Sequence, residues 1–180
     1  MTNPLLLRTR RALAAALVLV ASSAFAAKPH QHGTAKLDVA VEPGKVTIDL
    51  ASPLDNLLGF EHAPRNDAER ERADAAVAVL KAADTLLRID PAARCTLAKV
   101  TLDSAALQLG TPDPKEAAEG HADLDGSFEF VCPGAAPGFV EIGLFEAFPR
   151  LQRIDVQTAT MKGQAKAVLK RPANRIGLTR

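Results

Sequence analysis

The sequence is poor in the residues and motifs that usually mark an enzyme or a metal protein. Only two of the 180 residues are cysteines and four are histidines. No GxSxG, HExxH or glycine-rich phosphate loop is present, so no pattern of a serine hydrolase, a metalloprotease or a nucleotide-binding protein is found. The cysteines form no CxxC or CxxH pair, which argues against a thiolate zinc site. We therefore expect a protein that is not an enzyme.

Long apolar runs are absent outside the N-terminus. Three arginines within residues 8–11 precede an apolar run at residues 12–20, and the Ala-Phe-Ala of residues 24–26 fits the small-x-small cleavage rule. This combination is typical of a secretory signal peptide, and the run is shorter than the about 20 residues that cross a bilayer. We predict a signal peptide at residues 1–26 and a soluble, exported domain at residues 27–180, with no membrane insertion once the signal is removed.

Neither sign of charge is in large excess. The predicted signal peptide carries three arginines and no acid, so its removal lowers the formal net charge from +1 to −2. A mildly acidic protein gives no reason to expect nucleic acid as a partner. The remaining length is that of a single domain, which can bury a core large enough to fold without a metal.

The two cysteines, Cys95 and Cys132, make an even pair. In an oxidising compartment such a pair usually forms a disulfide, and this one would contribute at most about 4 kcal/mol on the entropic account. Two reduced, buried thiols are the alternative. We predict the disulfide.

Alternation of apolar and polar residues predicts most of the strands. Residues 35–41 and 45–50 alternate on either side of the turn signal Glu42-Pro43-Gly44, which indicates a β-hairpin. Residues 52–65 have no clean period and are expected to form an ordered connection with one helical turn. Five further strands are predicted at residues 96–109, 121–132, 139–145, 154–160 and 165–170.

One substantial helix is predicted at residues 66–88. Asn66 is a suitable N-cap, and Glu69 three residues later completes a capping-box pattern. Apolar residues recur at intervals of three and four, and Asp84 could begin a second short helix. The expected fold is therefore α+β, a mostly antiparallel sheet of about seven strands with one helix packed against it.

Two short rows of metal-ligating residues are the main candidates for a functional site. His121, Asp123 and Asp125 alternate along a predicted strand and project to one side of it. His30 and His32 are also two residues apart, and they project to one side if the first strand begins at them. Imidazole and carboxylate groups are ligands that zinc uses. The two rows side by side would form one shared metal site. Alternatively, the histidines lie in a loose tail and the acids belong to an ordinary surface.

Three segments carry a resemblance to a known family. They read HQHGTAKLDVAVEPGKVTIDLASPLDNLLGFEHAPR, HADLDGSFEFVC and LFEAFPRLQRIDVQ. In this order they resemble the ZrgA-like family of bacterial periplasmic zinc-binding proteins, from about His30 to Leu169. The resemblance implies a periplasmic protein that binds zinc ion and assists its acquisition, with components of an ABC-type importer as partners. Many members carry a histidine-rich run before the acidic strand, where this chain has a single histidine, His121.

The sequence is also compatible with two other functions. The runner-up is a metal-independent envelope protein-interaction module that docks through a sheet edge or through residues 52–65, with Leu57 and Phe60 as apolar anchors. A zinc hydrolase is a third class, with Glu129 or Asp125 as the base. We interpret the fourth histidine, His62, as hydrogen-bonded within its loop, with Phe60 packed into the core.

Overall fold

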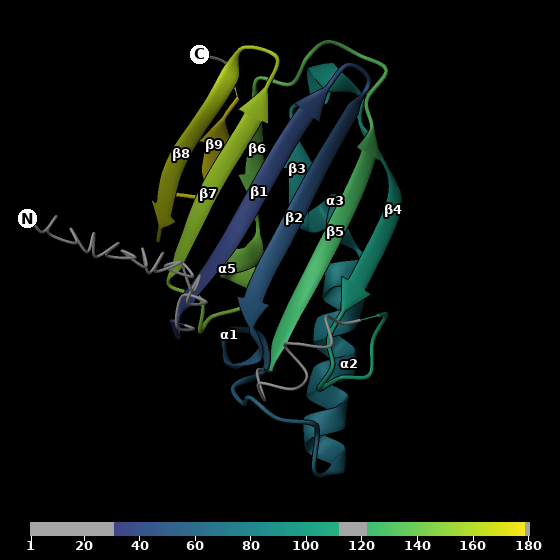
Figure 1. The fold of residues 1–180 in the computed structure, drawn as a ribbon, viewed down its shortest axis with the longest axis vertical. Helices are drawn as coiled ribbons and strands as arrows, with labels where there is room; N and C mark the ends of the chain where they lie inside the picture. The colour runs from purple at the N-terminus through teal and green to yellow at the C-terminus, as the bar shows by residue number, and fades with distance from the viewer. Residues whose placement is uncertain (1–30, 112–121, 179–180) are drawn as a thin grey trace, which may run out of the picture.

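The computed structural model describes residues 31–111 and 122–178, which form two β-sheets and a set of short and long helices (Figure 1). The larger sheet has six strands in the order β4-β5-β2-β1-β7-β8. β1 and β7 are parallel, whereas the other neighbours in this sheet are antiparallel. Its strands span Thr34–Glu42 (β1), Lys45–Pro53 (β2), Thr96–Asp103 (β4), Asp123–Val131 (β5), Arg153–Thr160 (β7) and Gly163–Lys170 (β8).

A smaller three-stranded sheet, in the order β3-β6-β9, lies behind one face of the larger sheet together with α3 and α5 (Figure 1). Its strands span Leu87–Ile89 (β3), Phe139–Ile142 (β6) and Arg175–Gly177 (β9). The helices span Leu54–Leu58 (α1), Asp67–Lys81 (α2), Ala83–Leu86 (α3) and Leu144–Ala147 (α5), and a 3-10 turn spans Pro91–Ala93. This is the α+β fold expected from the sequence, and it is mainly antiparallel. The described residues contain nine strands, not seven, because β3 and β9 are too short to show a period.

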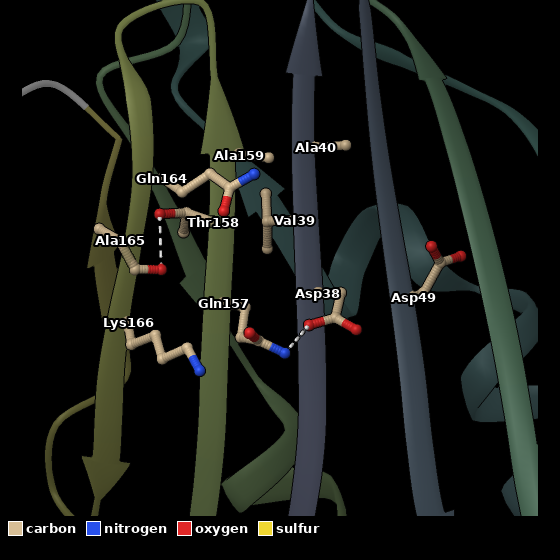
Figure 2. Close-up of a pocket in the computed structure, with 10 residues that line it drawn as sticks. All are labelled: Asp38, Val39, Ala40, Asp49, Gln157, Thr158, Ala159, Gln164, Ala165 and Lys166. Carbon is tan, nitrogen blue, oxygen red and sulfur yellow. Dashed lines mark hydrogen bonds between the residues drawn. The ribbon is translucent and has the colours of Figure 1, made fainter.

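Alternation along β1, β2, β5 and β7 sorts the large sheet into a core face and an open face. Leu37, Ile48, Phe128 and Ile154 lie on the core face and are at most 1% exposed. Burying a side chain of this size stabilises the fold by about 1.5–3 kcal/mol. The open face, defined by the residues of opposite parity, is polar; Figure 2 shows part of it over β1, β2, β7 and β8.

The predicted β-hairpin is confirmed as β1 and β2, with Val39 opposite Ile48 and Glu42 opposite Lys45. Gly44 in the turn has φ 76°, a left-handed conformation that glycine adopts without a steric cost. The helical turn expected within residues 52–65 is α1.

The predicted helix begins as expected but ends earlier. Asn66 Oδ1 accepts a hydrogen bond from Glu69 N at 2.9 Å, as an N-cap does. The helix stops at Lys81 and not at Arg88, because Ala82 leaves the helical conformation and α3 follows. The last residues of the predicted helix pair with β6 as β3, so tertiary pairing overrides the helical period there.

Two predicted strands are also shorter than expected. β4 ends at Asp103, and the chain then forms a turn that Ser104 and Leu109 close by pairing with each other. β6 ends at Ile142 because Gly143, whose N–H donates to Leu86 O at 2.7 Å, leads into α5.

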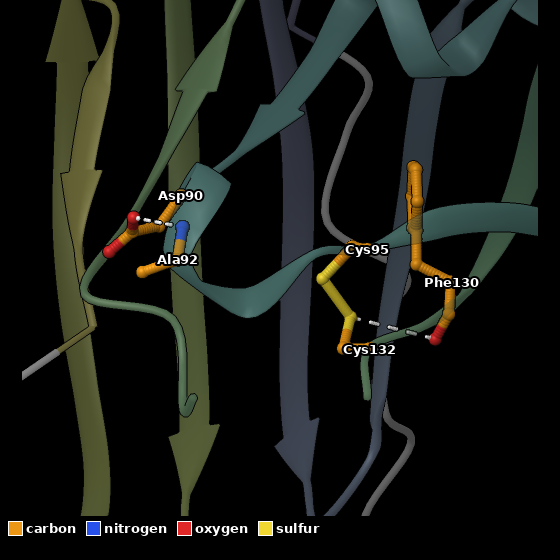
Figure 3. Close-up of a disulfide and its surroundings, with 5 residues drawn as sticks. All are labelled: Asp90, Ala92, Cys95, Phe130 and Cys132. Carbon is orange, nitrogen blue, oxygen red and sulfur yellow. Dashed lines mark hydrogen bonds between the residues drawn. A yellow bond between two sulfur atoms is a disulfide. The ribbon is translucent and has the colours of Figure 1, made fainter. Parts of the chain in front are cut away.

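The predicted disulfide is confirmed, with Cys95 bonded to Cys132 (Figure 3). It joins the residue before β4 to the residue after β5 at one end of the large sheet. Cys132 N also donates to Gly44 O at 2.8 Å, so the bond lies beside the turn between β1 and β2.

No helix in the described part of the chain combines the length and the apolar character needed to cross a membrane. The longest, α2, has 15 residues. The predicted signal peptide lies outside the described residues.

Candidate functional site

His32 lies in a turn at the end of the sheet where β1 begins. β1 starts at Thr34, and Gly33 before it has φ 76°. The alternation of the strand therefore does not extend back to His32, so the strand geometry on which the expected row of His30 and His32 depends is not present at His32. His30 lies outside the described residues.

The chain next to His32 is held by a buried amide. Asn56 on α1 is 1% exposed, its Oδ1 accepts from Gly33 N at 2.6 Å, and its Nδ2 donates to Thr34 O at 2.9 Å. From the other side, Gln152 N and the next backbone N–H donate to Gly33 O. His32 is thus carried by backbone that is fixed on both sides, which is the preorganisation that a binding site needs.

The imidazole of His32 lies between two carboxylates. Its Nδ1 is 3.4 Å from Asp55 Oδ2, and its Nε2 is 3.4 Å from Glu61 Oε1. The His32 side chain is 64% exposed and Glu61 35%, whereas Asp55 is only 13% exposed. The Glu61 side of the His32 ring is therefore more accessible to solvent than the Asp55 side.

An arginine occupies the other side. Arg150 Nη2 donates to Asp55 Oδ1 at 2.8 Å and to Oδ2 at 3.0 Å, and its Nε donates to the backbone oxygen of Asp55 at 2.9 Å. A cation next to Asp55 disfavours a second cation there. A hydrogen bond from His32 Nδ1 to Asp55 would leave Nε2, on the Glu61 side, as the nitrogen for a metal, in the carboxylate-histidine-metal arrangement common in proteins.

The spacing on the Glu61 side fits zinc. A nitrogen and an oxygen bound at about 2.0–2.2 Å to one tetrahedral ion lie about 3.4 Å apart, which is the separation of His32 Nε2 and Glu61 Oε1. We call these two donors the half-site. In the part of the chain that the structure describes, no group of three or more His, Cys, Asp or Glu side chains is placed to hold one metal ion. The half-site would need further ligands.

The predicted acidic row lies on β5, two strands away from β1. Asp123 is opposite Pro53 and Asp125 is opposite Ala51 of the intervening strand β2. Both acids and Gln31, the residue before His32, line one depression of about 470 Å³ on the open face. The structure therefore brings the N-terminal segment and the acidic row to one surface, without placing His32 and these acids in contact.

The third member of that row, His121, lies outside the described residues. The residue after it, Ala122, accepts a hydrogen bond from Leu54 N at 2.8 Å through its backbone oxygen. Leu54 precedes Asp55 in α1, so the start of the acidic strand is anchored next to the half-site's supporting carboxylate.

Acids also face one another elsewhere on the open face. Asp38 and Asp49 are direct partners across β1 and β2, and Asp103 and Asp125 across β4 and β5. Like charges placed directly opposite destabilise a sheet. Gln157 Nε2 partly offsets this by donating to Asp38 Oδ1 at 3.2 Å (Figure 2). Basic side chains, Lys36, Arg153 and Lys166, line the same depression as Asp123 and Asp125, so the open face carries charges of both signs.

His62 has the structural role expected of it. Its Nδ1 lies 2.9 Å from Ala63 O, its ring stacks on Phe60 with centroids 4.9 Å apart, and Phe60 packs against the core. Its Nδ1 is also 3.8 Å from Glu69 Oε2. The backbone N–H of Arg65, and more weakly the charge of His62, lower the pKa of Glu69.

Sequence reasoning missed three residues around His32 and left Glu61 undecided. Glu61 had a usable signal, since it lies in the GFEHAPR segment that carries the family resemblance. Asn56 and Asp55 lie in a connection without a clean period, and nothing local marks Arg150 as the partner of Asp55. Only the folded chain brings Asp55 and Arg150, which are 95 positions apart, to one end of the sheet.

The fold and the half-site together define a class: an α+β protein with a polar, charged sheet face and a histidine-carboxylate pair suited to zinc. Residues 29–178 match the ZrgA family, which is described as a family of zinc uptake proteins. The match covers most of the sequence, so the chain belongs to the ZrgA family and has a role in zinc uptake. No curated protein matches the chain.

Proposed function

We propose that this chain is a zinc-binding accessory protein of the periplasm, without catalytic activity, that assists zinc acquisition by passing the ion to an ABC-type importer. Family membership supports zinc uptake, and the predicted signal peptide supports export. The single observation that carries zinc binding is the half-site, in which His32 Nε2 and Glu61 Oε1 stand at a tetrahedral ligand spacing.

We further propose that donors from the predicted ligand set complete the shell. The candidates are His30, His121, Asp123 and Asp125, of which the two aspartates line the same depression as Gln31. Zinc prefers four ligands, so one or two of these donors and a water would suffice. Arg150 and Asp55 orient His32 without binding the ion.

Calorimetric titration of the mature protein with zinc tests this proposal. His32→Ala and Glu61→Gln should each weaken binding by about tenfold or more, because each removes one direct ligand from a four-ligand shell. His62→Ala is the matched control, since it removes a histidine from the same surface that is not in the half-site. Unchanged affinity in both half-site variants would refute the half-site.

Four further variants, His30→Ala, His121→Ala, Asp123→Asn and Asp125→Asn, then identify the remaining ligands. If a variant binds zinc with the wild-type affinity, the residue that it replaces is not a ligand. Zinc binds neutral imidazole, so the affinity should also fall as the pH drops below about 6.5.

The metal-independent interaction module makes the opposite prediction. It expects no bound metal after purification and no effect of zinc on unfolding, whereas native-state binding should stabilise by about 2.7 kcal/mol at a hundredfold excess over the dissociation constant. Thermal unfolding with and without zinc separates the two.

The importer partnership is tested by growth under zinc limitation: deleting the gene should impair growth. A gene that encodes the double variant His32→Ala with Glu61→Gln should not restore it.

A further inference from the structure

The two edges of the six-stranded sheet differ in regularity. At the β4 edge, the register with β5 shifts between Leu97 and Lys99, and the disulfide ties the residue before the strand. Bulges of this kind protect an edge from further pairing. At the other edge, β8 pairs with β7 without a shift from Gly163 to Lys170 (Figure 1).

The outer backbone of β8 is available for pairing. A two-residue turn joins Thr160 to Gly163, which makes them a hydrogen-bonded pair and directs the backbone groups of alternate residues outward. The outward residues are Gln164, Lys166 and Val168, and then Lys170, whose carbonyl accepts from Ala173 N at 2.8 Å. This bond shows that the backbone carbonyl of Lys170 points outward, and it marks the residue at which the free edge ends.

The side chains of the same residues give the edge a positive charge. Lys162, Lys166 and Lys170 form no ion pair with any residue that the structure describes, and no acid lies between residues 161 and 172. Between two of these lysines, Val168 is 49% exposed. Lys166 continues a row that crosses the open face through Gln157 of β7 (Figure 2).

We propose that β8 binds an extended acidic segment of a partner protein as a seventh strand of the sheet. Side chains on one face of a strand alternate, so the segment that fits opposite Lys166, Val168 and Lys170 has the pattern acid-x-apolar-x-acid. The β8 strand of a second copy offers no such pattern, because it contains no acid. The proposal is independent of zinc binding.

The test uses a labelled, end-blocked peptide, Thr-Glu-Thr-Val-Thr-Glu-Thr, titrated with the mature protein by fluorescence anisotropy. Binding should saturate and should weaken when ionic strength rises from about 0.1 M to about 1 M. The double variant Lys166→Glu with Lys170→Glu should bind at least about fivefold more weakly, and a peptide with lysine in place of glutamate should bind that variant better than wild type. Lys99→Glu on the β4 edge is the matched control and should change nothing.

A backbone variant separates strand addition from simple charge attraction. Val168→Pro removes an outward N–H and no bond to β7, so it should abolish peptide binding while zinc affinity and melting temperature stay at wild-type values. Should this variant misfold, a peptide N-methylated at alternate residues provides the same test on wild-type protein. The proposal fails if the acidic peptide does not bind saturably, if blocking the backbone has no effect, or if ultracentrifugation shows that a second copy occupies this edge.

Discussion

The two ends of the large sheet are held together by different kinds of bond. At the end where β1 begins, here called the clamp end, polar side chains join α1 to the loop before β7: Asn56 holds Gly33, and Arg150 holds Asp55. At the opposite end, here called the disulfide end, Cys95 and Cys132 are joined covalently. We therefore expect the disulfide end to serve stability alone, and the clamp end to serve both stability and the orientation of side chains that meet solvent.

Removing the disulfide is the strongest test of this division. Cys95→Ala with Cys132→Ala should lower the free energy of unfolding by up to about 4 kcal/mol, because a bridge across a sequence separation of 37 no longer restricts the unfolded chain. Zinc affinity under native conditions should be unchanged. Urea unfolding and calorimetry measure the two quantities, and a parallel loss of zinc affinity would show that the ends are coupled.

Asn56 is the residue whose change should affect both stability and binding. Asn56→Ala should lower the free energy of unfolding by about 2 kcal/mol, because Gly33 N and Thr34 O lose their partner in a buried position. Zinc affinity should fall as well. Asn56→Asp keeps an acceptor for Gly33 N but buries a carboxylate against the Thr34 carbonyl, so it should lower the free energy of unfolding at least as much as Asn56→Ala.

Arg150 should affect binding far more than stability. Its side chain is 57% exposed, so the ion pair with Asp55 contributes little to the folded state. Arg150→Met should nevertheless weaken zinc binding by about tenfold, as removal of groups that orient a ligand commonly does. Arg150→Lys keeps the charge but not the bidentate geometry and should recover only part of the affinity. Equal affinity in wild type and Arg150→Met would contradict the orienting role.

The smallest expected effect is a pH dependence at the disulfide end. Hydrogen bonds from Ala92 N and Gly138 N, with the more distant charge of Arg175, lower the pKa of Asp90 from its ordinary value of 3.8 (Figure 3). A lowered pKa contributes stability above the ordinary value, and this contribution is lost as the pH falls through the folded-state pKa. Asp90→Asn should therefore reduce the acid sensitivity of unfolding below about pH 4. A melting curve with an unchanged acid limb would count against it.

The sequence predicts the large sheet well because β1, β2, β5 and β7 each have a buried and an open face. β1, β2, β5, β7 and β8 are found within two residues of their predicted bounds, apart from one end of β2. Prediction fails where neighbours in space decide the structure. The end of the predicted helix at residues 82–88 is divided between α3 and β3, since pairing with β6 captures Leu87–Ile89.

The same reasoning explains what could be predicted of the candidate site. His32 could be predicted as a candidate because it forms a visible pattern with His30, two residues before it. Its supports, Asp55 and Arg150, are single charged residues of a common type whose meaning arises only from their contact across the fold. The predicted ligand set of His30, His32, His121, Asp123 and Asp125 thus remains a prediction. The structure adds Glu61 as a further candidate ligand.

The one parallel pairing in the large sheet has a consequence for how this site is assembled. Parallel neighbours begin at the same end, so the residues that lead into β1 and those that lead into β7 arrive side by side although they are distant along the chain. Were the two strands antiparallel, the guanidinium of Arg150 would enter at the far end, beside the cysteines. The direction of β7 thereby decides whether Asp55, which flanks His32, is held by Arg150.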